Sequence, residues 1–306
     1  MLPADSELSL TRTVSGRPMG ASYNLNVSVV SDYLSGKIRR DGSISFSEFM
    51  RAALYHPGHG YYTKPGREVF GRDGDFFTAA QVQPLFGILI ARIAAPYGGV
   101  FVDWGAGRAE MRLHFADYIA VEAQDVLPER FEGFVLANEL FDALPVDVYS
   151  DGVERRVTVD GGRFAWDGPV KAPVREVAPG LAAMIDEIGS KLQRGALLVL
   201  DYGYTERELA RFPMGTLMSY RRHWASADVL DSPGERDITA HVNFDALRAA
   251  ARAAGFRERR FTTMQQILLD AAEGLDEETL LAHRLQWKTL LVGMGEEFRA
   301  LLLEKG

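Results

Sequence analysis

Asn138, Glu139 and Asp142 place an amide and two carboxylates close together, directly after an apolar run. Grouped carboxylates can bind a guanidinium bidentately and take up its proton as the nitrogen becomes nucleophilic. If the segment is helical, Glu139 and Asp142 lie on one face, because residues three apart on a helix are neighbours. The same residue types also form helix caps and solvated first turns. Both interpretations stay open from the residues alone.

A second candidate site is the glycine-containing segment from Asp103 to Gly107, which follows another apolar run. Gly105 and Gly107 would let the backbone turn tightly and approach a ligand, with the N-terminus of a following helix behind it. A dinucleotide-binding fingerprint requires a third glycine at position 110, where this chain has Glu110. A carboxylate there faces a pyrophosphate unfavourably, which disfavours a nicotinamide oxidoreductase and suits a cationic cofactor without phosphates. A turn that binds no ligand is the alternative.

Glu122 lies 15 residues after Gly107, at the end of the apolar run 118–121. An acidic side chain at the end of a second strand can bind ribose hydroxyls, as in nucleotide-binding βαβ units. A solvated strand end is the alternative interpretation. The six histidines show no metal-ligand spacing, so we expect no metal site.

Three short apolar runs, at 100–102, 134–136 and 197–200, predict the strands that position these residues. Short runs without alternation are typical of parallel strands that are buried on both faces. In open α/β sheets, ligands bind beyond the carboxyl ends of such strands, where the candidate residues fall. The remaining pattern predicts helices over 45–57, 84–95, 243–255, 264–272 and 277–291, a β-hairpin over 153–166, little periodicity over 204–239, and a last strand over 298–303.

Composition and charge exclude several classes of protein. Of 306 residues, 47% are hydrophobic and 25% charged, as in globular proteins. The formal net charge of −8 argues against nonspecific nucleic-acid binding and is compatible with a cationic substrate. The absence of cysteine excludes disulfides, a thiolate nucleophile and Cys-ligated zinc. No apolar run reaches the roughly 18–20 residues of a membrane span, and no signal-peptide pattern occurs near the start, so we expect a cytoplasmic protein.

Six short segments between Ser45 and Leu303, taken in order, resemble the MidA family of S-adenosylmethionine-dependent methyltransferases. This family includes the mitochondrial arginine methyltransferase that assists respiratory complex I assembly. The segments are 47–50 with 61–63, 74–78, 137–146, 201–204, 237–242 and 294–298. Each segment is short, but their order and spacing make the resemblance specific.

The resemblance implies an α/β fold with a Rossmann-like methyltransferase core, an N-terminal helical lobe, and β-hairpin and loop insertions. On this chain the expected parts are a polar lead-in over 1–42, the lobe over 43–99, and the core over 100–306, with insertions at about 147–180 and 204–240. The implied activity is methyl transfer from S-adenosylmethionine, which in the best-known members goes to a protein arginine.

The family's functional residues can be carried onto matching positions of this chain. To the cofactor site the resemblance assigns Asp75, Thr78, Asp103, Gly105, Gly107 and Glu122. Glu122 would bind the ribose, and Asp75 and Thr78 would line the entrance. Asn138, Glu139 and Asp142 would face the methyl acceptor.

The chain departs from the family pattern in its cofactor half. The glycine loop, usually G-P-G-R-G, is here Gly105-Ala106-Gly107-Arg108-Ala109. Only 31 positions separate Gly107 from Asn138. This is about the length of one βαβ unit, whereas a methyltransferase core has two strand-helix units there and a loop that cradles the adenine.

Three hypotheses follow from this combination of features. The chain is a methyltransferase acting on a protein arginine, a methyltransferase acting on a small molecule, or a non-catalytic binding or assembly factor with the same fold. The clustered carboxylates favour an enzyme, whereas the shortened cofactor half favours the binding factor.

Overall fold

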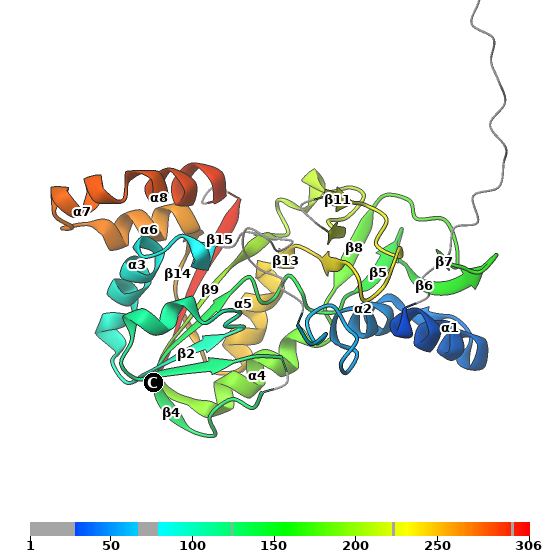
Figure 1. Ribbon diagram of the computed structural model, residues 1–306, viewed down its shortest axis with the longest axis horizontal. Coiled ribbons are helices and arrows are strands. Elements are labelled where there is room, and N and C mark those ends of the chain that lie inside the picture. Colours follow the sequence, from blue (N-terminus) through cyan, green and yellow to red (C-terminus); the bar gives the residue numbers. More distant parts are fainter. Residues whose placement is uncertain (1–27, 67–78, 124, 222–223, 295–296) are drawn as a thin grey trace, which may run out of the picture.

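The short apolar runs form the centre of the main sheet (Figure 1). In the computed structural model, which describes residues 28–66, 79–123, 125–221, 224–294 and 297–306, the strand order is β14-β15-β9-β4-β2-β3. The strands are β2 (Val100–Trp104), β3 (Tyr118–Val121), β4 (Phe131–Asn138), β9 (Leu192–Tyr204), β13 (Val242–Asn243), β14 (Arg257–Thr263) and β15 (Phe298–Lys305). β3, β2, β4 and β9 are parallel, β15 and β14 are antiparallel additions, and β13 pairs with the end of β9. The prediction of parallel strands from these runs is confirmed.

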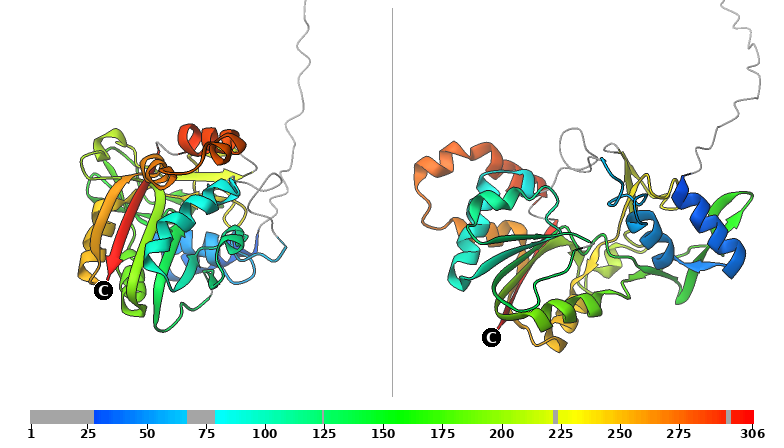
Figure 2. Two further views of the ribbon diagram at one scale, coloured as in Figure 1. Left: turned by 90° about the vertical axis from the view of Figure 1, so that its left-hand side faces the viewer. Right: turned by 60° about the horizontal axis from the view of Figure 1, so that its bottom comes forward.

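The parallel strands are buried on both faces because their apolar side chains alternate between two cores. In β9, Leu197 and Val199 pack into one core, whereas Leu198 and Leu200 pack into the other. Helices cover both faces (Figure 2), α4 (Leu181–Lys191) and α5 (Phe244–Ala253) on the first, α3 (Leu85–Ala94) and α6 (Met264–Ala272) on the second. The helices predicted over 84–95, 243–255 and 264–272 are therefore confirmed. Within the described ranges, no helix is long and apolar enough to cross a membrane.

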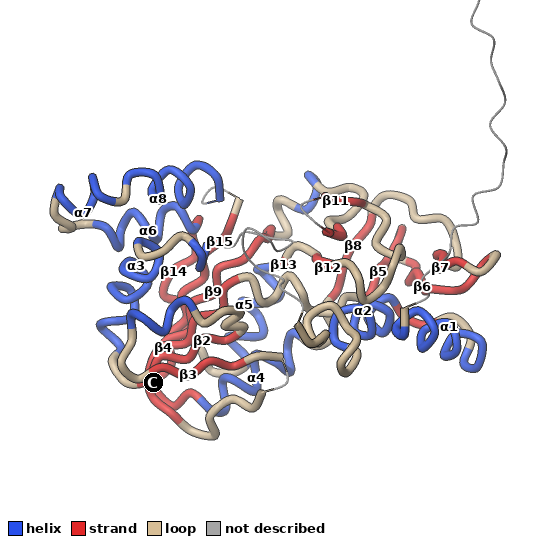
Figure 3. The backbone as a smooth tube through the Cα atoms, viewed as in Figure 1, coloured by secondary structure: helices blue, strands red, loops and turns tan. Residues whose placement is uncertain are grey.

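A lobe with its own apolar core lies beside the carboxyl ends of the parallel strands (Figure 3). Its elements are α1 (Val29–Asp41), β1 (Ile44–Ser45), α2 (Phe46–Tyr55), β5 (Asp147–Ser150), β6 (Val153–Asp160), β7 (Arg163–Trp166), β8 (Val174–Val177), β10 (Met218–Arg221), β11 (Trp224–Ser226) and β12 (Asp237–Thr239). A capping box of Ser45 and Glu48 starts α2, within the range 45–57 where a helix is predicted. β6 and β7 form the predicted hairpin.

The stretch 204–239, which showed little periodicity, folds into the three-stranded sheet β11-β10-β12. The strands are too short for a pattern of period two to be visible in the sequence. Ser219 pairs with Ile238, and both are buried on one side of the sheet. Tyr220 pairs with Asp237, so these two side chains lie on the other side.

Three expected ranges differ from the structure. α1 occupies part of the range expected to be a polar lead-in, because Val30, Leu34 and Ile38 form an apolar stripe against the lobe. α3, expected in the lobe, packs on the main sheet instead. The helix predicted over 277–291 is broken at His283, and the chain then turns so that Trp287 and Leu290 contact the core beneath α3 and α6. The pieces are α7 (Glu277–Ala282), α8 (Arg284–Lys288) and the π-helix η5 (Thr289–Met294).

The shortening anticipated between Gly107 and Asn138 is visible at one edge of the main sheet. Between β2 and β4, the described residues form a 3₁₀-helix, η3 (Glu110–His114), and the strand β3, but no α-helix. The ring of Phe115 stacks on Phe101 with centroids 3.6 Å apart, which covers part of the sheet face. In the described residues the sheet ends at β3. The remaining 3₁₀-helices are η1 (Ala79–Gln81), η2 (Ala95–Tyr97) and η4 (Leu209–Arg211).

Candidate functional site

Asp201 organises the turn that carries the predicted acceptor residues. Its Oδ2 accepts hydrogen bonds from the backbone N–H groups of Leu140 at 3.2 Å, Phe141 at 2.8 Å and Asp142 at 3.3 Å. Its Oδ1 accepts from its neighbour Tyr202 at 2.9 Å. Because a fully buried carboxylate holds three consecutive amides, the segment after β4 is a fixed turn. The helix considered for this segment is not formed.

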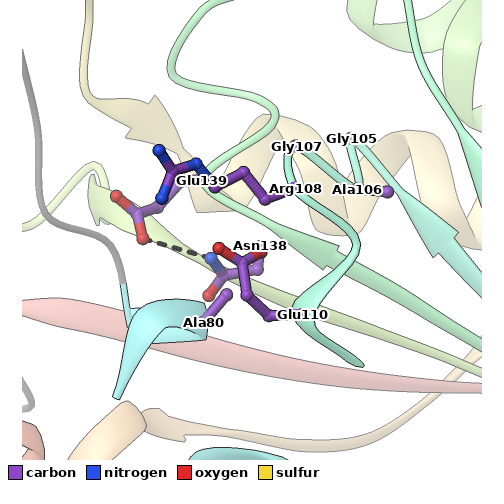
Figure 4. A pocket seen from close by; sticks show the side chains of 8 residues that line it. All are labelled: Ala80, Gly105, Ala106, Gly107, Arg108, Glu110, Asn138 and Glu139. Carbon is purple, nitrogen blue, oxygen red and sulfur yellow. Dashed lines mark hydrogen bonds between the residues drawn. The ribbon is translucent and has the colours of Figure 1, made fainter. Parts of the chain in front are cut away.

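Glu139 is held in an unusual backbone conformation directly after β4. Its φ of 52° lies in the left-handed region, which costs energy for a residue with a side chain. Its N–H donates to the carbonyl of Leu200 at 2.9 Å, which ties the turn to β9. Its Oε1 accepts from the N–H of Ala79 at 3.2 Å and from Asn138 Nδ2 at 3.1 Å (Figure 4). Burial, and then the charge of Asp142, raise the pKa of Glu139 to about 8.

Asp142 joins this turn to the lobe. Its side chain is buried, and burial raises its pKa to about 7 against the opposing effect of nearby backbone N–H groups. Its carbonyl accepts from the N–H of Ala240 at 2.9 Å. The hydroxyl of Tyr55, on α2, donates to the carbonyl of Ala143 at 3.0 Å. Both faces of the turn are therefore fixed, one by the main sheet and one by the lobe.

The surroundings of this turn are strongly acidic. The ion pairs of the described residues include none to Glu139, Asp142 or Asp201. Burial is the main cause of the raised pKa of four tyrosines, and the charge of Asp142 adds to it in each case; they are Tyr55, Tyr62, Tyr202 and Tyr220. Asp237 contributes to the raised pKa of Glu139 from the lobe. A cation in this region would stabilise the ionised carboxylates.

The glycine loop lies directly beside the turn that follows β4. Gly105 and Gly107 have φ values of 80° and 56°, in the left-handed region that glycine adopts without strain. A Cβ at Gly105 would lie 3.0 Å from Leu140 Cδ1, so the loop and the turn pack closely. They border an open pocket (Figure 4), which is lined by Ala80, Gly105, Ala106, Gly107, Arg108, Glu110, Asn138 and Glu139.

Glu122 lies at the rim of the glycine loop, as predicted. Its Oε1 accepts from the N–H of Gly107 at 2.6 Å, and its N–H donates to Asp125 at 2.9 Å. Partial desolvation raises its pKa, while the Gly107 hydrogen bond lowers it. Its second oxygen accepts no hydrogen bond from the described residues and can accept one from a ligand.

Asp103 differs from its expected place. It lies inside β2 instead of after it, because the strand continues to Trp104. It is buried, accepts a hydrogen bond from the hydroxyl of Tyr118 at 2.7 Å, and is not among the residues that line the pocket. Burial raises its pKa to about 6. Asp103 therefore links β2 to β3 next to the start of the glycine loop.

Of the other predicted site residues, some lie together at the pocket or in the adjoining turn, and the rest fall outside the described residues. Asn138 and Glu139 share the pocket with Gly105 and Gly107, and Asp142 lies in the same turn. Asp75 and Thr78 fall outside the described residues. Within the described ranges, no group of His, Asp or Glu side chains is arranged to hold a metal ion.

Sequence reasoning missed four residues around this turn: Asp201 and Tyr55, which fix it, and Tyr220 and Asp237, which interact electrostatically with Asp142 and Glu139. Asp201 carried a signal, since it ends an apolar run just as Asn138 does. Tyr55 and Tyr220 carried none, because the fold alone brings α2 and the β10–β12 sheet to the end of β4, whereas Asp237 lies in the segment 237–242 that resembles the family.

The chemistry of the residues at the pocket suits the methionine and ribose parts of S-adenosylmethionine. The glycines leave the loop without side chains, and Glu122 supplies an acceptor for ribose hydroxyls. Asn138 Oδ1 is a buried acceptor without a hydrogen-bond donor among the described residues, which a ligand donor would satisfy. The described residues supply no element that corresponds to the adenine-binding loop.

Comparison with known proteins agrees with this fit. The family model described as "Putative S-adenosyl-L-methionine-dependent methyltransferase" matches residues 106–262, half of the chain. A crystal structure of a COG1565 superfamily member from Burkholderia thailandensis, bound to S-adenosyl-homocysteine, is 28% identical with a TM-score of 0.79. That match covers 90% of this chain and 92% of the other.

Two curated relatives extend the comparison. The mitochondrial protein arginine methyltransferase NDUFAF7 of Bos taurus is 25% identical over 383 aligned positions, covering 92% of this chain and 84% of the relative. Its homolog in Drosophila melanogaster is 26% identical, covering 86% and 79%. The first alignment is longer than this chain, so the relative contains insertions that this chain lacks. The chain belongs to the MidA family of S-adenosyl-L-methionine-dependent methyltransferases.

Proposed function

We propose that this protein transfers a methyl group from S-adenosylmethionine to an arginine nitrogen of a protein substrate. The observation that carries the proposal is the pair Glu139, half-buried in the lining of the glycine-loop pocket, and Asp142, buried in the same turn, neither with a basic partner among the described ion pairs. Two carboxylates fixed in one turn can bind the planar guanidinium from one side.

The residues around the pocket can hold the cofactor. Gly105 and Gly107 allow close approach, Glu122 accepts from the ribose hydroxyls, and Asn138 Oδ1 offers an acceptor on the opposite wall. When bound, the cofactor supplies an electrophilic methyl group on a sulfonium. The fixed turn places the acceptor carboxylates on the same pocket, which provides the proximity that methyl transfer requires.

Glu139 and Asp142 hold and move the proton. Because burial raises the pKa of Glu139 to about 8, this carboxyl keeps its proton near neutral pH until a cation arrives. An arginine guanidinium beside it favours the carboxylate form, so Glu139 releases its own proton to solvent as the substrate binds. Glu139 then accepts the proton that the nitrogen loses as the N–C bond forms and the C–S bond breaks. The positive charge lost by the sulfonium is thus balanced by the proton on Glu139, which solvent can remove.

The class of acceptor is supported by the relatives and by charge. Both curated relatives are named protein arginine methyltransferases. The lobe adds Tyr220 and the buried Asp237 on the side of the β10–β12 sheet opposite Ser219 and Ile238, and the charges of Asp142 and Asp237 both act on Tyr220. A net charge of −8 also suits a basic substrate.

The shortened edge favours a second function, a fold that binds a partner without catalysis. In the described residues, the sheet ends at β3 and only a 3₁₀-helix follows β2. The methionine and ribose parts of the cofactor would then keep their hydrogen-bond partners, whereas the adenine would have no partner among the described residues at this edge. The experiment below separates the two functions.

The test is transfer of tritium from methyl-labelled S-adenosylmethionine into proteins of an extract that lacks the endogenous enzyme. We expect labelling by the wild type at arginine and a loss of about 10²–10⁴-fold in Glu139→Gln, the share of a positioned acid–base group. Asp142→Asn should fall by a similar order. Glu187→Gln is the control, because this carboxylate is exposed on α4 and pairs only with Lys191.

Each outcome bears on one part of the proposal. Equal labelling by wild type, Glu139→Gln and Asp142→Asn would remove these residues from the chemistry. Label on a residue other than arginine would overturn the acceptor class. Measured cofactor binding without any labelling would favour the binding factor.

A further inference from the structure

Glu110 stands where a dinucleotide-binding loop would have its third glycine, and the structure directs it into the cofactor pocket. Ala109 has a φ of 57°, and its N–H donates to the carbonyl of Ala106 at 2.8 Å, so the loop makes a tight turn just before η3. This turn puts the Glu110 side chain on the pocket wall that faces Asn138 (Figure 4). A glycine or apolar residue would leave that wall uncharged.

The described residues that line the pocket include more acidic than basic side chains. Carboxylates of Glu110 and Glu139 lie on the two walls, and Arg108 is the single basic residue of the described lining. Glu110 is half-buried, and no ion pair to it occurs among the described residues. Burial raises the pKa of Glu110, whereas its own backbone N–H and then Arg108 lower it. Among the described residues, the other titratable groups that Glu110 influences are Tyr118 on β3 and Asp103 on β2.

The sulfur of the cofactor has to lie in this pocket. The pocket runs from the glycine loop, whose Gly107 bonds the ribose acceptor Glu122, to Glu139 at the acceptor turn. S-adenosylmethionine and S-adenosylhomocysteine share their adenine, ribose, ammonium and carboxylate groups. They differ in the methyl group and in the positive charge of the sulfonium. Only groups close to the sulfur can therefore distinguish them by charge.

We propose that Glu110 is a specificity-determining residue that makes the pocket bind S-adenosylmethionine in preference to S-adenosylhomocysteine. Its carboxylate attracts the sulfonium and loses this attraction once the methyl group has gone. For a partly solvated pair of charges, this attraction corresponds to about a ten-fold difference in dissociation constant.

The shortened cofactor half makes the charge of Glu110 more important for cofactor binding. Contacts to the adenine would bind substrate and product equally, and the described residues between β2 and β4 offer few of them. A pocket with fewer shared contacts depends more on those that are specific to the charged cofactor. Product release after each transfer then becomes easier, because the attraction ends with the reaction. The inference rests on the cofactor in the proposed function and does not depend on the acceptor.

The test is calorimetric titration of the full chain with S-adenosylmethionine, S-adenosylhomocysteine and sinefungin, in which a protonated amine replaces the sulfonium methyl. In Glu110→Gln, we expect the ratio of the product's dissociation constant to that of S-adenosylmethionine to fall about ten-fold. Sinefungin should follow S-adenosylmethionine, which separates the charge from the methyl group. Glu110→Asp keeps the charge and should restore most of the ratio.

Glu122→Gln is the matched control, because the ribose is common to all three ligands. It should weaken their binding by the same factor and leave the ratio unchanged. If Glu110→Gln weakens S-adenosylmethionine and S-adenosylhomocysteine equally, the carboxylate acts on a shared group such as the ammonium, and the inference is wrong. An unchanged ratio in a variant whose thermal unfolding matches the wild type would also overturn it. Failure of the wild type to bind either ligand would overturn the cofactor part of the proposed function as well.

Discussion

The acceptor turn (residues 139–143, after β4) and the β3 edge belong to the same sheet, with β2 between their strands, yet they are built very differently. At the acceptor turn, Asp201 and the lobe fix consecutive backbone groups from both sides. At the β3 edge, one 3₁₀-helix stands between the strands, and Leu113 and Val126 are 88% and 79% exposed. The more rigid of the two regions is the one that carries the proposed acceptor residues.

Physical reasons account for this difference. Methyl transfer depends on the relative position of nucleophile and methyl group, so a small displacement of Glu139 or Asp142 would slow the reaction. Contacts to the adenine lie remote from the reacting atoms and stabilise the bound cofactor in all states. Their reduction raises the dissociation constant and leaves the geometry of transfer intact. A shortened adenine side and an intact acceptor side are therefore compatible with an enzyme.

The largest effect should come from removing the carboxylate that holds the acceptor turn. Asp201→Ala leaves the buried N–H groups of Leu140, Phe141 and Asp142 without an acceptor, which should lower the free energy of unfolding by about 3–5 kcal/mol. Asp201→Asn keeps one oxygen and should lose about half as much. Chemical denaturation measures both, and a loss below about 1 kcal/mol in Asp201→Ala would contradict the role of Asp201.

Much of the main sheet could be predicted because its signals are local. The runs ending near Asp103, Asn138 and Asp201 predict buried parallel strands, and caps such as Ser45 and Asn243 predict helix starts that the structure confirms. The strand β15, at the end of the chain, was predicted within two residues of its end. These elements are specified by apolar spacing and by residues next to them in sequence.

The acceptor site could be predicted only in part, because half of it comes from distant segments. Glu139 and Asp142 were found from their types and place, but the helix considered for them is replaced by a turn that Asp201 holds from another strand. Tyr55 reaches this turn from α2, 88 residues away in sequence. No local pattern encodes such a contact, since it depends on how the lobe packs beside the sheet.

A smaller effect should appear in the dependence of stability on pH. Glu139 has a pKa raised from 4.5 to about 8, so the folded protein binds more protons than the unfolded chain between these values. Stability from this group is therefore greatest below about pH 4.5 and is lost as the pH rises toward 8. Thermal unfolding should show a flatter profile between pH 5 and 8 in Glu139→Gln than in the wild type. At the β3 edge, Asp103→Asn should flatten it less, because the pKa of Asp103 reaches about 6.

The smallest expected effects come from removing one hydroxyl in each region. Tyr118→Phe deletes the donor to Asp103 at the β3 edge, and Tyr55→Phe deletes the donor to the carbonyl of Ala143 at the acceptor turn. Both changes keep the ring, so each removes one hydrogen bond. The stability cost should be about 1–2 kcal/mol in each case, slightly larger for Tyr118 because its partner is a carboxyl group.

The two variants should nevertheless differ in turnover. Tyr55→Phe loosens the turn beside Asp142, so we expect kcat to fall several-fold with the cofactor dissociation constant unchanged. Tyr118→Phe acts beneath the glycine loop, so we expect a small rise in the cofactor dissociation constant with kcat nearly unchanged. Steady-state kinetics and cofactor titration of both proteins decide the point. If the effects are exchanged, or if both variants lower kcat equally, then rigidity at the β3 edge matters as much for the reaction as rigidity at the acceptor turn. The contrast between the two regions would then lie only in their exposure.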